Sequence, residues 1–267
     1  HGRVQAILKG VRRPNSKLKG AAESLTLFHV VFSPGRSLDV VRQVDAAEIF
    51  PALRANLIAM ATALVAEELV YHAVAIERLE QPSEEFAWMK RLFLCLDLLA
   101  MDASKTGMAK AQIIQLCLSI LTQFELLVLE NTGYFPTLDS CVACQSLMSN
   151  DEDVIEQWHY FSVGQGGILC RLCVQSQSHE VGLVKMMVQT CQFLSAVHQS
   201  LWMPENLLTQ ENSTYLETFS KMAVTPLPQP DTFIRAQKFL RYYFAQKLEK
   251  KFQSFDFLFQ IADSIKS

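Results

Sequence analysis

The chain has 267 residues, half of them apolar, and a formal net charge of −3 at pH 7. This is enough for one large domain or two to three small ones with a hydrophobic core, and it excludes a uniformly acidic or basic chain. Seven cysteines without a signal peptide indicate a reducing cytoplasm. The most apolar run, Ile113–Leu129, contains Gln115, Gln123 and Glu125, so we expect a buried helix there and no transmembrane segment.

The segment before Pro51 has the pattern of β-strands. Alternating apolar residues predict strands over Arg3–Leu8, Thr26–Phe32 and Ser37–Val44. Between the first two, Arg12–Gly20 contains proline, asparagine, serine and glycine, which are typical of an exposed loop. Ser33-Pro34-Gly35 predicts a turn. We therefore expect a small β-rich domain at this end.

This β-rich segment is also basic. No acid occurs before Glu23, and six cations stand in the first twenty residues: Arg3, Lys9, Arg12, Arg13, Lys17 and Lys19. Together they produce a local positive field that suits contact with a phosphate backbone without base reading. The alternative is a solubilising surface, and composition alone does not choose between the two.

Helical patterns follow. Pro51 starts an apolar stripe that runs towards Arg78, and Pro82-Ser83 breaks the chain and caps a second helix that continues through Leu99. A third helix is expected over about 109–130, because Asn131-Thr132-Gly133 would stop it.

Two Cys-x-x-Cys pairs come next, Cys141/Cys144 and Cys170/Cys173, each after a turn-prone or glycine-containing run. Two such pairs can close a tetrahedral thiolate cage, so we predict a Zn²⁺ site. Four thiolates leave no open coordination position, which makes the site structural rather than catalytic. The alternatives are reduced bystander thiols or a site that has lost its metal.

The linker between the pairs holds other polar residues. His159 could be a spare ligand, but four thiolates fill the shell, so an exposed or hydrogen-bonded histidine is favoured. Asp151, Glu152 and Asp153 fit a solvated loop tip better than a metal site. Gly164, Gly166 and Gly167 precede a cysteine pair rather than a helix, so they shape a turn and do not cradle phosphate.

The remainder is again predicted to be helical. We expect a long helix over Val181–Trp202, a rigid connector at Pro226–Pro230 and a last helix from Asp231 to about Phe252, followed by a short apolar tail. Cys95, Cys117 and Cys191 fall within apolar helical patterns and are expected to be small buried hydrophobes.

The last helix carries three cations at a spacing of three, Arg235, Lys238 and Arg241, interleaved with aromatic residues. They share one face, which could receive an acidic peptide or a DNA strand. A solvated helix face is the equally supported alternative.

No catalytic set assembles. The chain lacks the G-x-x-x-x-G-K-[ST] phosphate loop, H-E-x-x-H and G-x-S-x-G. We therefore expect a protein without enzymatic activity; a zinc nuclease is the disfavoured option, because neither an open metal site nor a catalytic base is visible.

Three stretches together resemble the RecO family of bacterial recombinational repair mediators. They are K-G-V-R-R-P-N-S-K-L-K-G (Lys9–Gly20), F-P-A-L-R (Phe50–Arg54) and G-Y-F-P-x-L-x-x-C-x-x-C…F-S-x-x-x-G-G-x-L-C-x-x-C (Gly133–Cys173). The resemblance covers nearly the whole chain in the family's order.

The resemblance implies an α+β fold with an N-terminal OB-fold, a helical domain and a zinc-binding element inserted among the helices. It implies binding of single- and double-stranded DNA, strand annealing, and cooperation with RecR in loading RecA onto strands coated by single-stranded-DNA-binding protein (SSB), whose acidic C-terminal tail is contacted. It also implies a cytoplasmic, nucleoid-associated location. By position, Lys9, Arg12, Arg13, Lys17 and Lys19 match the family's basic run, and the four paired cysteines match its metal ligands.

We therefore expect an OB-fold domain over residues 1–48 that lacks its first strands, since an OB-fold needs five strands and only three are predicted. The helical domain would follow over 49–267, with a zinc-ribbon-like insertion at 133–174. The competing hypothesis is an interaction scaffold that docks repair partners and touches DNA weakly.

Overall fold

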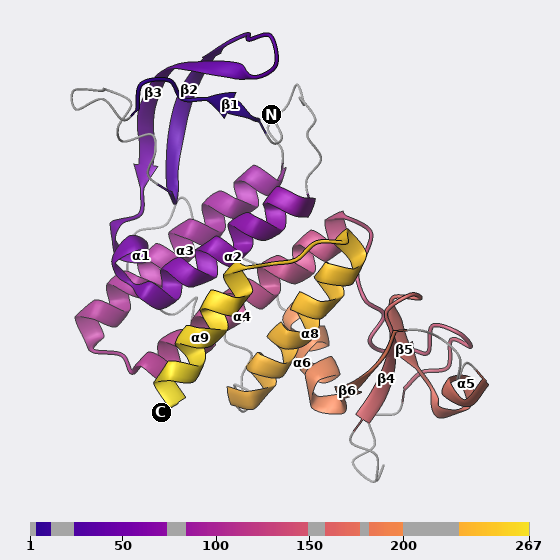
Figure 1. Cartoon of the computed structure of the whole chain (residues 1–267). Helices are drawn as coiled ribbons and strands as arrows, with labels where there is room; N and C mark the ends of the chain where they lie inside the picture. Colours follow the sequence, from indigo (N-terminus) through magenta and orange to yellow (C-terminus); the bar gives the residue numbers. More distant parts are fainter. Residues whose placement is uncertain are drawn as a thin grey trace. The chain divides into compact units, whose positions relative to one another are not determined.

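The computed structural model describes residues 4–11, 24–73, 84–148, 158–176, 182–199 and 230–266, and within them the fold is α+β (Figure 1). The fold class is as predicted. The chain divides into two compact units, one formed by residues 1–113 with 257–267 and the other by residues 114–256.

The first unit opens with a three-stranded sheet, in the order β1-β3-β2. Strand β1 (Ala6–Ile7) runs parallel to β3 (Asp39–Ile49), and β2 (Thr26–Ser33) runs antiparallel to it. The described residues thus supply three strands of the five that an OB-fold requires.

Strand β3 is longer than the pattern of Ser37–Val44 predicts. The register pairs Thr26 with Ile49 and Ser33 with Val40, so β3 extends as far as its partner reaches. Two register shifts in β2, at Leu27/Phe28 and Val31/Phe32, interrupt the alternation of the side chains. Pairing with a neighbour, which no local pattern contains, decides where this strand ends.

The helix predicted from Pro51 is two helices in the structure, α1 (Pro51–Ala55) and α2 (Leu57–Ala73). Asn56 separates them, because its backbone is extended and its Oδ1 accepts hydrogen bonds from the N–H groups of Ile58 and Ala59 at 3.1 Å each. Asparagine is a strong N-cap residue, so it starts α2 where it ends α1. The predicted end near Arg78 lies outside the described residues.

The helix predicted after Pro82-Ser83 is α3 (Glu84–Thr106). It packs with α1 and α2 around a core that contains Leu53, Leu69, Leu92 and Leu96, each fully buried. The carboxylate of Asp97 on α3 accepts the N–H of Leu53 at 2.8 Å, which satisfies a donor in the first turn of α1 that has no partner within its own helix.

The third predicted helix is α4 (Lys110–Asn131), which begins in the first unit and continues in the second. By length and composition it could cross a membrane, and no other helix in the described residues could. In this fold, however, 78% of its most apolar window is buried inside the structure. It is therefore placed as a core helix, as its interspersed polar residues predict.

The second unit contains another three-stranded sheet, in the order β5-β4-β6. Strand β4 (Trp158–Ser162) pairs antiparallel with β5 (Gly167–Leu169) and with β6 (Leu183–Met187). The single helix predicted over Val181–Trp202 is therefore wrong at its start. The helix there is α6 (Val188–Gln199), because the preceding five residues complete the sheet against β4.

The core of this unit is rich in aromatic residues. Helix α8 (Pro230–Leu248) buries Phe239 and Tyr243, which meet the edge of Phe161 on β4 at ring-centroid distances of 4.9 and 5.3 Å. Phe233 of α8 packs in the same edge-to-face manner on Phe193 of α6, at 4.9 Å. These contacts fix α6 and α8 against the sheet.

The apolar tail that follows is a helix of its own, α9 (Ser254–Lys266), with Phe255 and Leu258 buried.

Candidate metal centre

The first cysteine pair lies in a tight turn that follows α4. The N–H of Cys141 donates to the carbonyl of Ser146 at 2.9 Å, and the N–H of Gln145 donates to the carbonyl of Cys141 at 2.7 Å. Gln145 has a φ of 62°, which turns the backbone directly after Cys144. The turn holds both thiols on one short loop, as the spacing predicts.

The second pair lies at the end of a hairpin. Strand β5 stops at Leu169, Cys170 follows it, and Cys173 belongs to the short helix α5 (Arg171–Ser176). The N–H of Val142 donates to the carbonyl of Ile168 at 2.9 Å and thereby joins the first turn to this hairpin.

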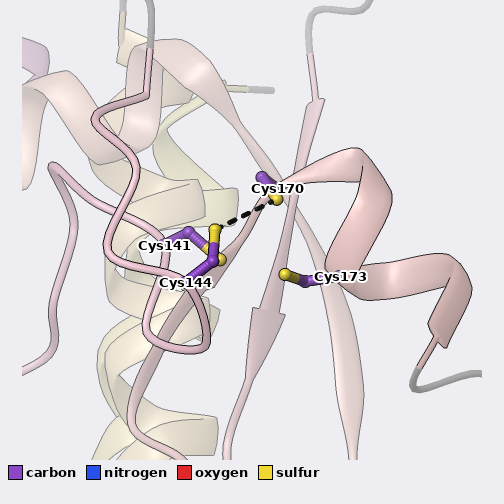
Figure 2. Close-up of side chains that lie close together, drawn as sticks. All are labelled: Cys141, Cys144, Cys170 and Cys173. Atoms are coloured by element: carbon purple, nitrogen blue, oxygen red, sulfur yellow. Dashed lines mark hydrogen bonds between the residues drawn. The ribbon is translucent and has the colours of Figure 1, made fainter.

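The two pairs face each other (Figure 2). All four Sγ atoms lie within 4.8 Å of one another, and those of Cys144 and Cys170 are 3.7 Å apart. In a tetrahedral site with Zn–S bonds of about 2.3 Å, neighbouring sulfurs are separated by about 3.8 Å. The cluster therefore has the donor set and the size of a closed four-thiolate metal site.

Gly167 permits this arrangement. A Cβ at this position would overlap Cγ1 of Val142, and it would lie 2.8 Å from Cβ of Thr137 and 2.9 Å from its carbonyl oxygen. Only glycine lets β5 approach the loop of the first pair so closely. Gly167 thus shapes the turn before Cys170, as predicted.

The electrostatics of the cluster favour a cation. Hydrogen bonds, first of all from the side chain of Ser146, lower the pKa of Cys144 to about 6. Burial raises the pKa of Cys141, but backbone N–H groups, chiefly that of Cys170, offset this and lower it overall. The pKa of Cys173 is raised to about 12, foremost through its hydrogen bond with Cys170. Four thiolates this close repel one another, so full ionisation requires a positive ion among them.

His159 is not part of the cluster. Its ring is on β4, where burial lowers its pKa, and it lines a cleft with Asp139, Cys191 and His198. Within the described residues the only group with metal-ligand geometry is the four cysteines. The acidic run Asp151–Asp153 lies outside them.

Comparison with known proteins matches two segments of the chain to models of the same family. Residues 1–50 match the family model described as "Recombination protein O N terminal", and residues 112–208 match "Recombination protein O C terminal". A DNA repair protein RecO from Alkaliphilus metalliredigens is 31% identical over 195 residues, which are 73% of this chain and 70% of the relative. The chain belongs to the RecO family.

Two further RecO proteins show how far the similarity extends. One from Pelotomaculum thermopropionicum is 31% identical over 185 residues, which cover 69% of this chain and 62% of the relative. One from Desulforamulus reducens is 25% identical over 257 residues, covering 96% of this chain and 83% of the relative. The first of these matches thus spans about three fifths of the relative's length.

The predicted DNA-binding residues of this RecO-family chain are described only in part. Lys9 is exposed in the turn that follows β1. Arg3, Arg12, Arg13, Lys17 and Lys19 lie outside the described residues. The DNA surface therefore stays a prediction from the sequence.

The three cations of the last helix differ in their surroundings. Arg241 forms an ion pair with Asp256 at 2.6 Å. Arg235 lies 3.8 Å from Asp231 and contacts the sulfur of Met187 at 2.6 Å. Lys238 is exposed. Two of the three cations thus have partners within the chain, which leaves Lys238 most accessible to another molecule.

One residue that supports the metal centre of this RecO-family chain was not predicted. Lys247 at the end of α8 donates to the carbonyl of Gly164, in the β4–β5 turn, at 3.3 Å. Its Nζ also lies 5.7 and 5.5 Å from the ring centroids of Tyr134 and Tyr243. The lysine thereby fastens the cysteine-bearing hairpin to α8. No local sequence pattern could reveal a contact between residues this far apart.

Proposed function

We propose that this chain is a recombinational DNA repair mediator that binds and anneals DNA and, with RecR, helps to load RecA onto SSB-coated single strands. It acts without enzymatic chemistry, in the bacterial cytoplasm at the nucleoid. Membership of the RecO family is the observation that carries the proposal.

The charge of the first twenty residues supports the DNA-binding step. Six cations stand there without a neighbouring acid, and Lys9, the one in the described residues, is exposed. Annealing then follows from charge neutralisation, because two strands whose phosphates are paired with cations repel each other less. Six phosphate contacts would make DNA affinity fall about 10³-fold between about 50 and 200 mM salt.

For the cysteine centre we propose Zn²⁺ with a structural role. Cys141, Cys144, Cys170 and Cys173 would hold the ion, and a closed four-thiolate shell leaves no position for substrate or water. When bound, the ion supplies folding energy to the loop and hairpin that carry its ligands.

The test is annealing and binding of fluorescent oligonucleotides as salt is varied. Lys9, Arg12 and Arg13 changed together to glutamate should abolish annealing and flatten the salt dependence. The matched control changes three exposed lysines elsewhere, Lys105, Lys110 and Lys250, to glutamate. It makes the same change in net charge, so it should leave annealing within about twofold if the effect is local.

Equal losses in both triple variants would mean that net charge alone matters. Absence of DNA binding at low salt would refute the mediator and favour the scaffold hypothesis. The scaffold is tested separately by binding to an acidic peptide that ends in phenylalanine, as a substitute for the SSB tail. Binding that depends on Lys238 and survives removal of residues 1–50 would support the scaffold.

A further inference from the structure

The four cysteines of the metal centre differ in their access to solvent. Cys141 is 1% exposed, Cys170 and Cys173 are half-buried, and Cys144 is exposed. The exposure extends along the loop of Cys144, since every residue over 143–147 is exposed as well. A small water-soluble reagent can therefore reach one sulfur of the centre directly.

The exposed sulfur has a close neighbour in the other pair. Cys144 Sγ lies 3.7 Å from Cys170 Sγ, across the centre (Figure 2). A disulfide bond is about 2.0 Å long, so the two atoms need to approach by less than about 2 Å. The movement can come from the loop of Cys144, which is the exposed partner, whereas Cys170 is anchored between β5 and α5.

We propose that the four-cysteine centre is an oxidation site, at which a peroxide joins Cys144 to Cys170 in a disulfide and expels the metal ion. The inference rests on the metal assignment proposed above. It adds the chemical class of the reagent, the pair of sulfurs that reacts and the consequence for the centre.

The reaction takes place in two steps. The sulfur of Cys144 attacks one oxygen of hydrogen peroxide, the O–O bond breaks, hydroxide leaves, and Cys144 becomes a sulfenic acid. The thiolate of Cys170 then attacks that sulfur, the S–O bond breaks and a second hydroxide leaves. The two sulfurs together lose two electrons and the peroxide gains them. Cys141 and Cys173 stay reduced, and a pair of thiolates holds the ion far more weakly than four.

The other three cysteines of the chain provide an internal reference. Cys95, Cys117 and Cys191 are 2%, 0% and 3% exposed. Burial raises the pKa of Cys95 and of Cys191 to about 12, so these thiols hold their protons at neutral pH. Buried thiols of this kind are inert towards oxidants. Oxidation should therefore be confined to the metal centre.

The experiment treats the full chain, first analysed for zinc, with dilute hydrogen peroxide. A chromogenic chelator follows metal release, and alkylation before and after reduction, with peptide mapping, identifies the oxidised cysteines. We expect one ion released per disulfide formed, a Cys144–Cys170 crosslink, and alkylation of Cys95, Cys117 and Cys191 only after denaturation. Thiol reductant with added zinc should restore the centre.

Two variants sharpen the assignment. Cys144→Ser should abolish the crosslink, and the conservative Ser146→Ala, which removes a hydroxyl 3.1 Å from Cys144 Sγ, should retain it. If Cys144→Ser does not fold, the crosslink in the unchanged chain decides alone. A disulfide within either pair, random oxidation of all seven cysteines, or no disulfide at peroxide concentrations that oxidise a free thiol would overturn the proposal. Absence of zinc before treatment would refute the metal assignment instead, since the crosslink can be mapped without it.

Discussion

Glu125 is a carboxyl group completely buried within the second unit. Gln237 on α8 donates to its Oε2 at 2.6 Å and to Thr122 Oγ1 at 3.0 Å, while Oε1 has no hydrogen-bond partner in the described structure. Burial raises the pKa of Glu125 well above 4.5, so the fold favours the neutral form of this carboxyl. The residue thereby links the stability of the unit to pH.

We predict that this linkage is visible in unfolding. Above pH 4.5 the unfolded chain loses the proton of Glu125 while the folded chain keeps it, so the free energy of unfolding falls as pH rises, until the folded pKa is passed. The slope is at most about 1.4 kcal/mol per pH unit. Urea unfolding at several pH values should show that Glu125→Gln removes this contribution. Asp263→Asn, at an exposed position on α9, is the control and should leave the slope in place; equal slopes in all three proteins would contradict the prediction.

Gly167 gives a second prediction at the scale of one residue. Gly167→Ala would force a methyl group against the Thr137 backbone, which cannot move without opening the joint between loop and hairpin. We expect a loss of about 1–3 kcal/mol in unfolding free energy, as for other overpacked sites, and a lower zinc content. Gly107→Ala is the comparison. Gly107 has a φ of +68° but no atom within 4 Å of the added carbon, so the variant should lose stability through backbone strain and keep its zinc.

Among the elements, α8 and the β4–β5 hairpin are joined by Lys247. Lys247→Met keeps much of the length of the side chain but removes the hydrogen bond to Gly164 and the contacts of the cation with two tyrosine rings. We predict a loss of about 0.5–1 kcal/mol and faster amide hydrogen exchange in the hairpin. Lys238→Met, at an exposed site on the same helix, should change neither. Unchanged exchange in the Lys247 variant would show that the aromatic core alone holds the hairpin.

Helix positions followed from local patterns, but some boundaries did not. Pro51 correctly predicted the start of α1, and Asn131-Thr132-Gly133 correctly predicted the end of α4. The strand β6 was predicted as helix, because Leu183–Met187 becomes a strand only through its pairing with β4, more than twenty residues earlier. Asn56 divides the predicted helix in two because it caps the second half. The spacing of apolar residues, on which the prediction rested, does not show where a helix is capped.

At the scale of the whole molecule, a variant of one proposed metal ligand tests whether folding and DNA binding depend on different parts of the chain. Cys141→Ser should lower zinc content and destabilise the chain by more than about 4 kcal/mol, because it removes the buried cysteine of the proposed structural site. If the DNA surface lies in the first twenty residues, the folded fraction should keep its affinity. Metal analysis, thermal unfolding and oligonucleotide titration measure the three quantities.

The control for this variant is Cys117→Ala, which alters a buried cysteine outside the centre. It should keep its zinc and lose only about 1 kcal/mol. A Cys141→Ser protein that stays fully folded but no longer binds DNA would mean that the segments carrying the four cysteines contact DNA themselves.

The sequence by itself determined the α+β class, the four cysteines that cluster as a candidate metal site and the family, because each depends on residue types at short or ordered spacings. A Cys-x-x-Cys pair needs one turn to form, and that turn is local. The tertiary structure alone decided that the two cysteine pairs meet, that Cys144 is the exposed one of the four, that no side chain fits at position 167 and that Lys247 joins the hairpin to α8. These features depend on contacts between residues distant in sequence, and such contacts exist only once the hydrophobic core has brought the segments together.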